Sequence, residues 1–84
     1  KYRQSLLVGS YKLGRRLSGI GSFGEAEQFH REALTDDGQL TPFDRVRSRV
    51  HYAYLLLRRA RYEEADQVLH NVLQIAEVEL APIT

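Results

Sequence analysis

The sequence predicts an all-α protein, and three observations indicate it. Apolar residues recur at three- and four-residue spacings, the period of one helical face, in four separate segments. No segment alternates strictly between apolar and polar residues, as a half-buried strand would. Glycine and proline mark the first two connections, at Gly19 and Gly21 and at Gly38 and Pro42, and the stretch from Arg45 to Glu79 contains neither. We therefore expect four helices arranged as two antiparallel pairs.

The first predicted pair joins residues 4–18 to residues 22–36. Glycines separate the two helices, and glycine is the residue that most often ends a helix. Ser22 precedes the second helix and is followed three residues later by Glu25, the spacing of a capping box. The sequence therefore sets both the end of the first helix and the start of the second.

The second predicted pair joins residues 41–59 to residues 62–77. Thr41 is a favourable N-cap, and Pro42 suits the first helical position because its missing N–H has no helical partner there. Residues 52–57 are apolar on nearly every side. A helix of that kind is expected to pack on several sides.

The two predicted pairs repeat each other at a constant offset of 39 residues, with no gap. The matching positions carry residue types that pack: small residues where two helices cross closely, and an aromatic residue at the turn. Such a fixed period is typical of stacked helical repeats. The matches join Leu13-Gly14, Gly21, Phe23, Glu25-Ala26 and Ala33-Leu34 to Tyr52-Ala53, Ala60, Tyr62, Glu64-Ala65 and Val72-Leu73.

This pattern resembles the tetratricopeptide repeat (TPR), which places Leu-Gly on its first helix and two alanines on its second. The chain departs from the family at Ser10 and Arg49, where a large aromatic residue is usual, and its period exceeds the usual length of about 34. The resemblance covers nearly the whole chain and implies a longer-period variant. It implies one domain over residues 1–84, with repeats at about 4–37 and 42–77 stacked as a short α-solenoid.

Composition excludes several classes of protein. The formal net charge is +1, which argues against nucleic-acid binding by bulk electrostatics. No cysteine occurs, so no disulfide framework or thiolate site is expected, and a reducing, cytoplasmic compartment is favoured. No apolar run approaches the length of a membrane helix. Because the chain does not begin with Met, we expect it to be a processed chain or a piece of a larger protein.

Three features that can indicate enzymes have other interpretations here. The segment 19–24 fits G-x-G-x-x-G, but it follows a helical stretch rather than a strand, so we interpret it as a helix–helix turn. The histidines, His30, His51 and His70, share no helical turn, so no metal site is expected. None of the serines has the setting of an activated nucleophile. We predict no enzyme and no cofactor.

The small net charge is a cancellation between segments. Residues 1–22 and 44–61 each carry +5, whereas residues 23–37 carry −4 and residues 62–84 carry −5. First helices are therefore basic and second helices acidic. In the family that the chain resembles, first helices line a concave surface, which here would be basic.

The resemblance implies a peptide-binding groove on that concave surface. Arginine grips carboxylates bidentately, and tyrosine offers an apolar face with a polar tip. We therefore expect an acidic, extended or helical segment of another protein as the ligand. The expected groove residues are Tyr11, Arg15 and Ser18 from the first repeat, and Arg47, Val50, His51, Tyr54 and Arg58 from the second.

Three alternatives stay open. The basic and acidic helices can pair with each other and with solvent, leaving no binding surface. Two repeats without a terminal capping helix expose apolar ends, so the chain can instead be a homo-oligomer that stacks or swaps repeats. Binding of RNA or DNA by the basic helices is the third alternative, and it would depend steeply on salt.

Overall fold

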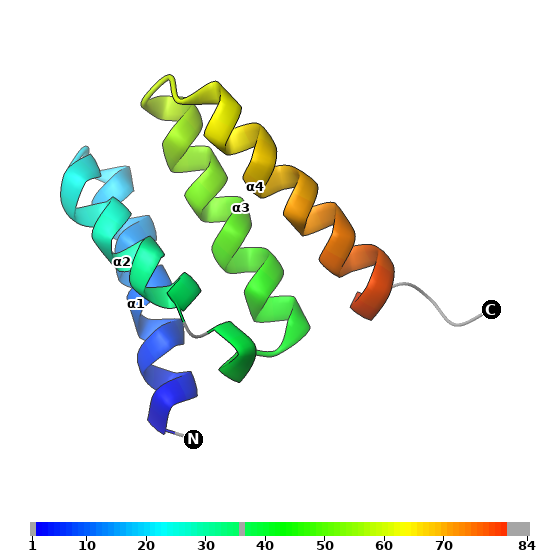
Figure 1. Cartoon of the computed structure of the whole chain (residues 1–84). Helices are drawn as coiled ribbons and strands as arrows, with labels where there is room; N and C mark the ends of the chain where they lie inside the picture. The colour runs from blue at the N-terminus through cyan, green and yellow to red at the C-terminus, as the bar shows by residue number, and fades with distance from the viewer. Residues whose placement is uncertain (1, 36, 81–84) are drawn as a thin grey trace.

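The computed structural model describes residues 2–35 and 37–80, which form helices joined by short turns (Figure 1). No strand occurs within those ranges, so the predicted all-α class is confirmed. The elements in chain order are α1 (Tyr2–Gly19), α2 (Phe23–Thr35), the 3-10 turn η1 (Asp37–Gln39), α3 (Pro42–Arg58), α4 (Tyr62–Ile75) and the π-helical turn η2 (Ala76–Leu80).

The observed helix ends agree closely with the predicted ones. The start of α3 has the predicted cap: the Thr41 hydroxyl accepts a hydrogen bond from the backbone N–H of Asp44 at 3.1 Å. Two elements were not predicted, the short turn η1 and the π-helical continuation η2. The predicted end at Asp36, like residues 81–84, lies outside the described residues.

The four helices form two pairs that pack side by side. Helix α1 packs on α2 and α3 packs on α4, while α2 and α1 both contact α3 (Figure 1). The molecule measures 42 × 32 × 18 Å along its principal axes. Helix α3 therefore lies centrally, in contact with all the other helices, and α1 and α4 lie at opposite ends.

The turns within the two pairs have the same geometry, 39 residues apart. Gly21 has a φ of 86° and Ala60, its equivalent, has a φ of 59°. The N–H of Ser22 donates to the carbonyl of Leu17 at 2.8 Å, and the N–H of Arg61 donates to that of Leu56 at 2.9 Å. The repeat seen in the sequence is thus a repeat of local backbone structure.

The core lies where the two pairs meet. Its fully buried side chains include Leu55 and Leu56 from α3 and two alanines, Ala26 and Ala65, from the second helix of each pair. Helix α3 packs on several sides, as expected, because it contacts α1, α2 and α4. Tyr54 and Leu57 are largely exposed, because no element of the described chain covers that side of α3.

Candidate binding groove

An open cavity of about 500 Å³ lies along the exposed side of α3, between α1 and α4. Six of the eight predicted groove residues line it, and the other two do not. The six are Arg15, Ser18, Val50, His51, Tyr54 and Arg58. Most of its remaining wall is apolar, so the cavity combines a hydrophobic floor with cationic edges.

The two arginines of the cavity come from different helices and have no carboxylate partner among residues 2–35 and 37–80. Arg15 projects from α1, on an exposed part of the helix. The guanidinium of Arg58 lies over the ring of Phe23, 5.1 Å from its centroid, and Nη1 lies 3.5 Å from the carbonyl of Ser18. The aromatic ring holds Arg58 in place without neutralising its charge.

His51 lines the cavity and is half-buried. Burial lowers the pKa of its imidazole, and the positive charges of Arg15 and Arg47 lower it further. The ring is therefore neutral at neutral pH. It stacks on the ring of Tyr11, with centroids 6.4 Å apart and planes inclined by 21°.

The two predicted residues outside the cavity have other contacts. Tyr11 is only 3% exposed, and its hydroxyl donates to Oδ1 of Asp44 at 2.9 Å. Burial and this hydrogen bond raise the pKa of Tyr11 to about 12. Arg47 lies on α3 one helical turn before His51, and its guanidinium carbon lies 5.5 Å from the centroid of the Phe43 ring. Tyr11 therefore ties α1 to α3 and offers no free hydroxyl to a ligand.

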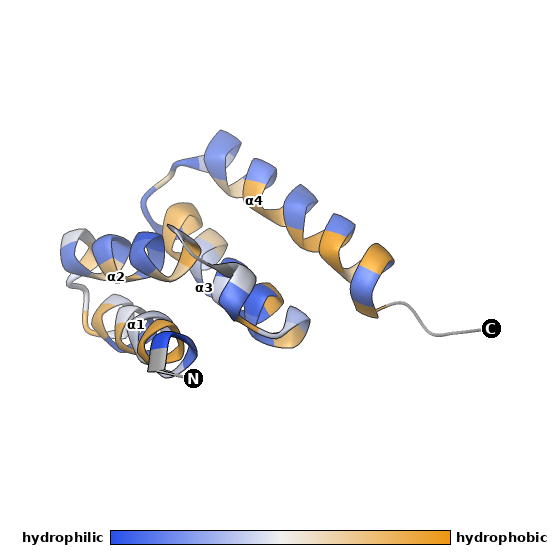
Figure 2. Cartoon of the chain, turned by 60° about the horizontal axis from the view of Figure 1, so that its bottom comes forward, coloured by the Kyte–Doolittle hydropathy of each residue, from blue (hydrophilic) through white to orange (hydrophobic). Residues whose placement is uncertain are grey.

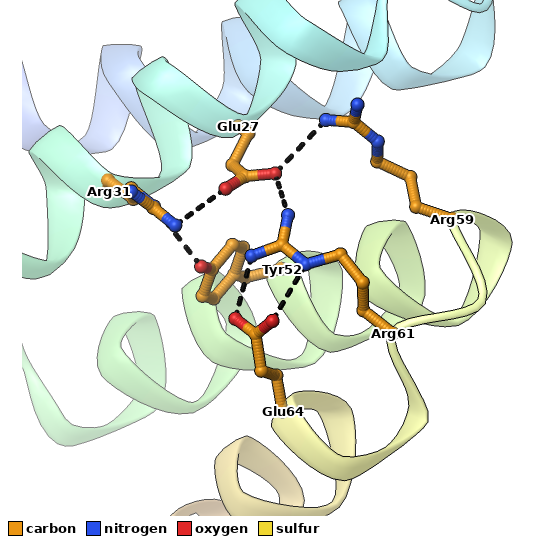
Figure 3. A network of polar contacts seen from close by, with 6 residues as sticks. All are labelled: Glu27, Arg31, Tyr52, Arg59, Arg61 and Glu64. Atoms are coloured by element: carbon orange, nitrogen blue, oxygen red, sulfur yellow. Dashed lines mark hydrogen bonds and ion pairs between the residues drawn. The ribbon is translucent and has the colours of Figure 1, made fainter.

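Some of the basic residues do pair with acidic helices. Glu27 on α2 is nearly buried and forms ion pairs with Arg31, Arg59 and Arg61 (Figure 3). The distances are 2.7 Å to Arg31 and 3.1 Å to Arg59. Arg61 also pairs with Glu64, and these carboxylates raise the pKa of its guanidinium. This network fastens the α3–α4 turn to α2.

Further ionic and polar contacts join α3 to the last turns of the described chain. Arg45 pairs with Glu79 of η2, and Nε of Arg49 donates to Oδ1 of Asn71 at 2.9 Å. The basic residues thus divide by position. Arg59 and Arg61 pair with carboxylates of α2 and α4, and Arg45 and Arg49 have acidic or amide partners. Arg15 and Arg58 line the cavity and have no carboxylate partner among the described residues, although Arg58 lies over Phe23. The alternative in which basic and acidic helices only pair with each other therefore explains the arginines that have such partners, and it does not explain Arg15 and Arg58.

Four cavity residues were not predicted from the sequence, namely Gly19, Ala53, Leu57 and Leu69. Ala53 and Leu57 follow Val50 and Tyr54 by three residues, so they share a helical face with residues that were predicted. The helical period of this face, continued by one turn, predicts both Ala53 and Leu57. Leu69 lies on α4, and only the packing of α4 against α3 brings it to the cavity.

Within the described ranges, no group of three or more His, Asp or Glu residues is arranged to hold a metal ion. None of the helices described is both long and apolar enough to cross a membrane. The chain matches no protein-family model, and comparisons with curated proteins and with solved structures found no match.

Proposed function

We propose that this chain is a TPR-like module of two repeats stacked as a short α-solenoid, which binds an acidic segment of another protein in the cavity beside α3. The role is binding, without catalysis. The observation that carries the proposal is the pair of cavity arginines, Arg15 and Arg58, which have no carboxylate partner among the described residues. An acidic ligand would supply the missing carboxylates.

The remaining wall of the cavity supports a ligand that is partly apolar. Tyr54 and Leu57 are exposed there, and an aromatic residue at the edge of an open cavity is a typical contact in protein interfaces. A cavity of about 500 Å³ accommodates a few side chains rather than a folded domain. The expected ligand is therefore an extended or helical segment in which acidic residues alternate with large apolar ones.

Binding of defined peptides tests the proposal. Fluorescence anisotropy would compare short peptides that alternate Asp or Glu with Leu or Phe against peptides of the same pattern with Lys and Arg. The acidic set should bind the wild-type chain. Arg15→Glu/Arg58→Glu should weaken binding by about tenfold or more, because charge-assisted contacts become repulsive.

A matched control variant makes the same change in net charge at two residues that lie outside the cavity. Lys12→Glu/Arg16→Glu alters two exposed cations of α1 that do not line the cavity. This control should bind the acidic peptides within about twofold of wild type. Equal loss in both variants, or none in either, would contradict the groove. Binding to an oligonucleotide with a steep salt slope, in the absence of peptide binding, would favour the nucleic-acid alternative.

A further inference from the structure

Exposed apolar residues at the two ends of the molecule occupy register positions that, inside the molecule, lie at the contact between the two repeats. Each residue of the first repeat has an equivalent 39 positions later in the second. His30 on α2 is fully buried, whereas its equivalent on α4, Leu69, is 38% exposed. Tyr52 on α3 is 7% exposed, whereas its equivalent on α1, Leu13, is 40% exposed.

These residues form two faces. The leading face lies on α1 and the turn that follows it, and the trailing face lies on α3 and α4. Along α4, apolar residues gather on one side and hydrophilic residues on the other (Figure 2). The leading face comprises Leu6, Leu13 and Ile20, equivalent to Arg45, Tyr52 and Arg59; the trailing face comprises Val50, Leu57, Leu69 and Leu73, equivalent to Tyr11, Ser18, His30 and Leu34.

Inside the molecule, the equivalent positions hold the two repeats together. The ring of Tyr52 lies 5.9 Å from that of His30. Glu27 on α2 pairs with Arg59 at 3.1 Å. Leu34 packs against the core cluster. The trailing face therefore occupies positions equivalent to those by which the first repeat contacts the second. The leading face occupies positions equivalent to those by which the second repeat contacts the first.

Helices α1 and α4, at the two ends of the molecule, are oppositely charged, whereas α3, which carries Val50 and Leu57 of the trailing face, has four arginines and one aspartate. Helix α1 carries four basic side chains and no acidic one, whereas α4 carries three acidic side chains and no Lys or Arg. The same polarity exists across the internal contact, where acidic α2 meets the arginines of α3. The charges of α1 and α4 favour approach of a leading face to the α4 side of a trailing face, whereas two copies of α1, or two of α4, repel each other.

We propose that a second copy of this chain docks its leading face on the trailing face, repeating the step that already relates the two halves of the molecule. In this register Leu69 lies against Leu13 of the second copy, as His30 lies against Tyr52. Asp66, the equivalent of Glu27, lies against Ile20 of the second copy. A head-to-tail contact of this kind does not close on itself, so further copies add to either end.

Stacking leaves the cavity arginine of α1 accessible. Arg15 is exposed although α3 is already docked beside α1. Its equivalent, Tyr54, should likewise stay exposed when α1 of a second copy docks. The inference does not rest on the proposed peptide binding. Val50, Leu57 and Leu69 of the trailing face also line the cavity, so a docked copy and a peptide would compete there, whereas Ile20 and Leu73 lie outside it.

Sedimentation velocity over a range of concentrations tests the stack. The average mass should rise from the 9.7 kDa of one chain as concentration increases, without a fixed upper limit. Ile20→Glu blocks the leading face by placing a carboxylate opposite Asp66, and Leu73→Glu blocks the trailing face. Each should lower the association constant about tenfold to a hundredfold. Both residues are highly exposed, so helicity should stay at the wild-type level.

Mixing the two blocked variants is the decisive step. Each retains one intact face, and the intact faces are complementary, so an equimolar mixture should form a 1:1 dimer that grows no further. Phe43→Glu, an apolar-to-acidic change at an exposed site on α3, should stack as wild type does. A monomer at every concentration would overturn the proposal. So would a variant that dimerises alone, because that result requires two like faces in contact.

Discussion

The two repeats share helix ends and turn geometry but differ where one repeat covers the other. In the first repeat the packed pair is Gly14 on α1 with His30 on α2, and both are buried. In the second repeat the equivalent pair is Ala53 with Leu69, and Leu69 is partly exposed. The covered repeat thus contains a polar ring, and the uncovered repeat contains an apolar side chain at the surface.

Close packing explains why the first pair has its particular composition. A Cβ atom on Gly14 would lie 3.0 Å from Cδ2 and Nε2 of His30 and 3.1 Å from the carbonyl oxygen of Ala26. The glycine therefore makes room for the imidazole. In the second repeat a leucine replaces the imidazole, and an alanine occurs in place of the glycine. Whether a side chain at an equivalent position is buried therefore depends on the helices that pack on the repeat, and the sequence of the repeat alone does not decide it.

The largest predicted effect concerns the buried imidazole. Neither ring nitrogen of His30 has a hydrogen-bond partner among the described residues. Burial, and to a lesser extent the nearby His51, lowers the pKa of His30 from 6.5 to about 4. The unfolded chain therefore binds a proton that the folded chain does not between these two pKa values. Stability should fall as pH drops from 6.5 to 4, by about 3 kcal/mol at most.

Urea unfolding of wild type and His30→Leu at several pH values tests this. The substitution installs the residue that the second repeat has at this position, and it should abolish most of the loss below pH 6.5. His70→Leu is the control, because it makes the same substitution at an exposed imidazole. If wild type and His30→Leu lose stability in parallel, the imidazole is not the buried base that the structure describes.

A smaller effect is predicted for another pair of equivalent residues, Glu27 and Asp66. Glu27 is nearly buried among three arginines, whereas Asp66 is exposed and lies 3.5 Å from His70. Glu27→Gln should destabilise the chain by about 2 kcal/mol, because it leaves the surrounding guanidinium groups without their shared carboxylate. Asp66→Asn should change stability by less than about 0.5 kcal/mol. Thermal unfolding at neutral pH measures both; equal effects would show that the network in Figure 3 does not fasten the repeats.

Much of the fold could be predicted from the sequence because local signals determine it. Spacing of apolar residues, the Thr41-Pro42 start and the glycines at the first turn each act within a few residues, and all were interpreted correctly. The exposure of Tyr54 and Leu57 could not be predicted in this way. Periodicity shows which face of a helix is apolar, but only the number of neighbouring elements decides whether that face is covered.

The candidate site was predictable to a similar extent. Register placed six residues at the cavity, four on α3 and two on α1, but it could not show that Tyr11 donates its hydroxyl to Asp44, a residue 33 positions away. It also could not separate arginines with internal partners from those without. Arg58 and Arg59 are adjacent in sequence, yet one lies over Phe23 and the other pairs with Glu27. Such differences arise from tertiary contacts, which no single segment encodes.

The smallest predicted effect lies in the turns, where the two repeats agree in conformation but differ in residue. Ala60 has a φ of 59°, in the left-handed region, and its equivalent is Gly21. An alanine side chain costs about 1–2 kcal/mol there, part of which the greater freedom of an unfolded glycine offsets. Ala60→Gly should therefore stabilise the chain by about 0.5–1 kcal/mol. Chemical denaturation should show a raised midpoint with an unchanged slope.

The reverse substitution in the first repeat completes this comparison. Gly21→Ala places a side chain in the same left-handed conformation, with no neighbouring atom in the way, so it should destabilise by about the amount that Ala60→Gly gains. Gly19→Ala is the control, because Gly19 is helical and its Cβ would also meet nothing; alanine should be neutral or stabilising there. If the two turn substitutions shift stability in the same direction, the turns are not equivalent, and the 39-residue register that relates the repeats fails at the turns.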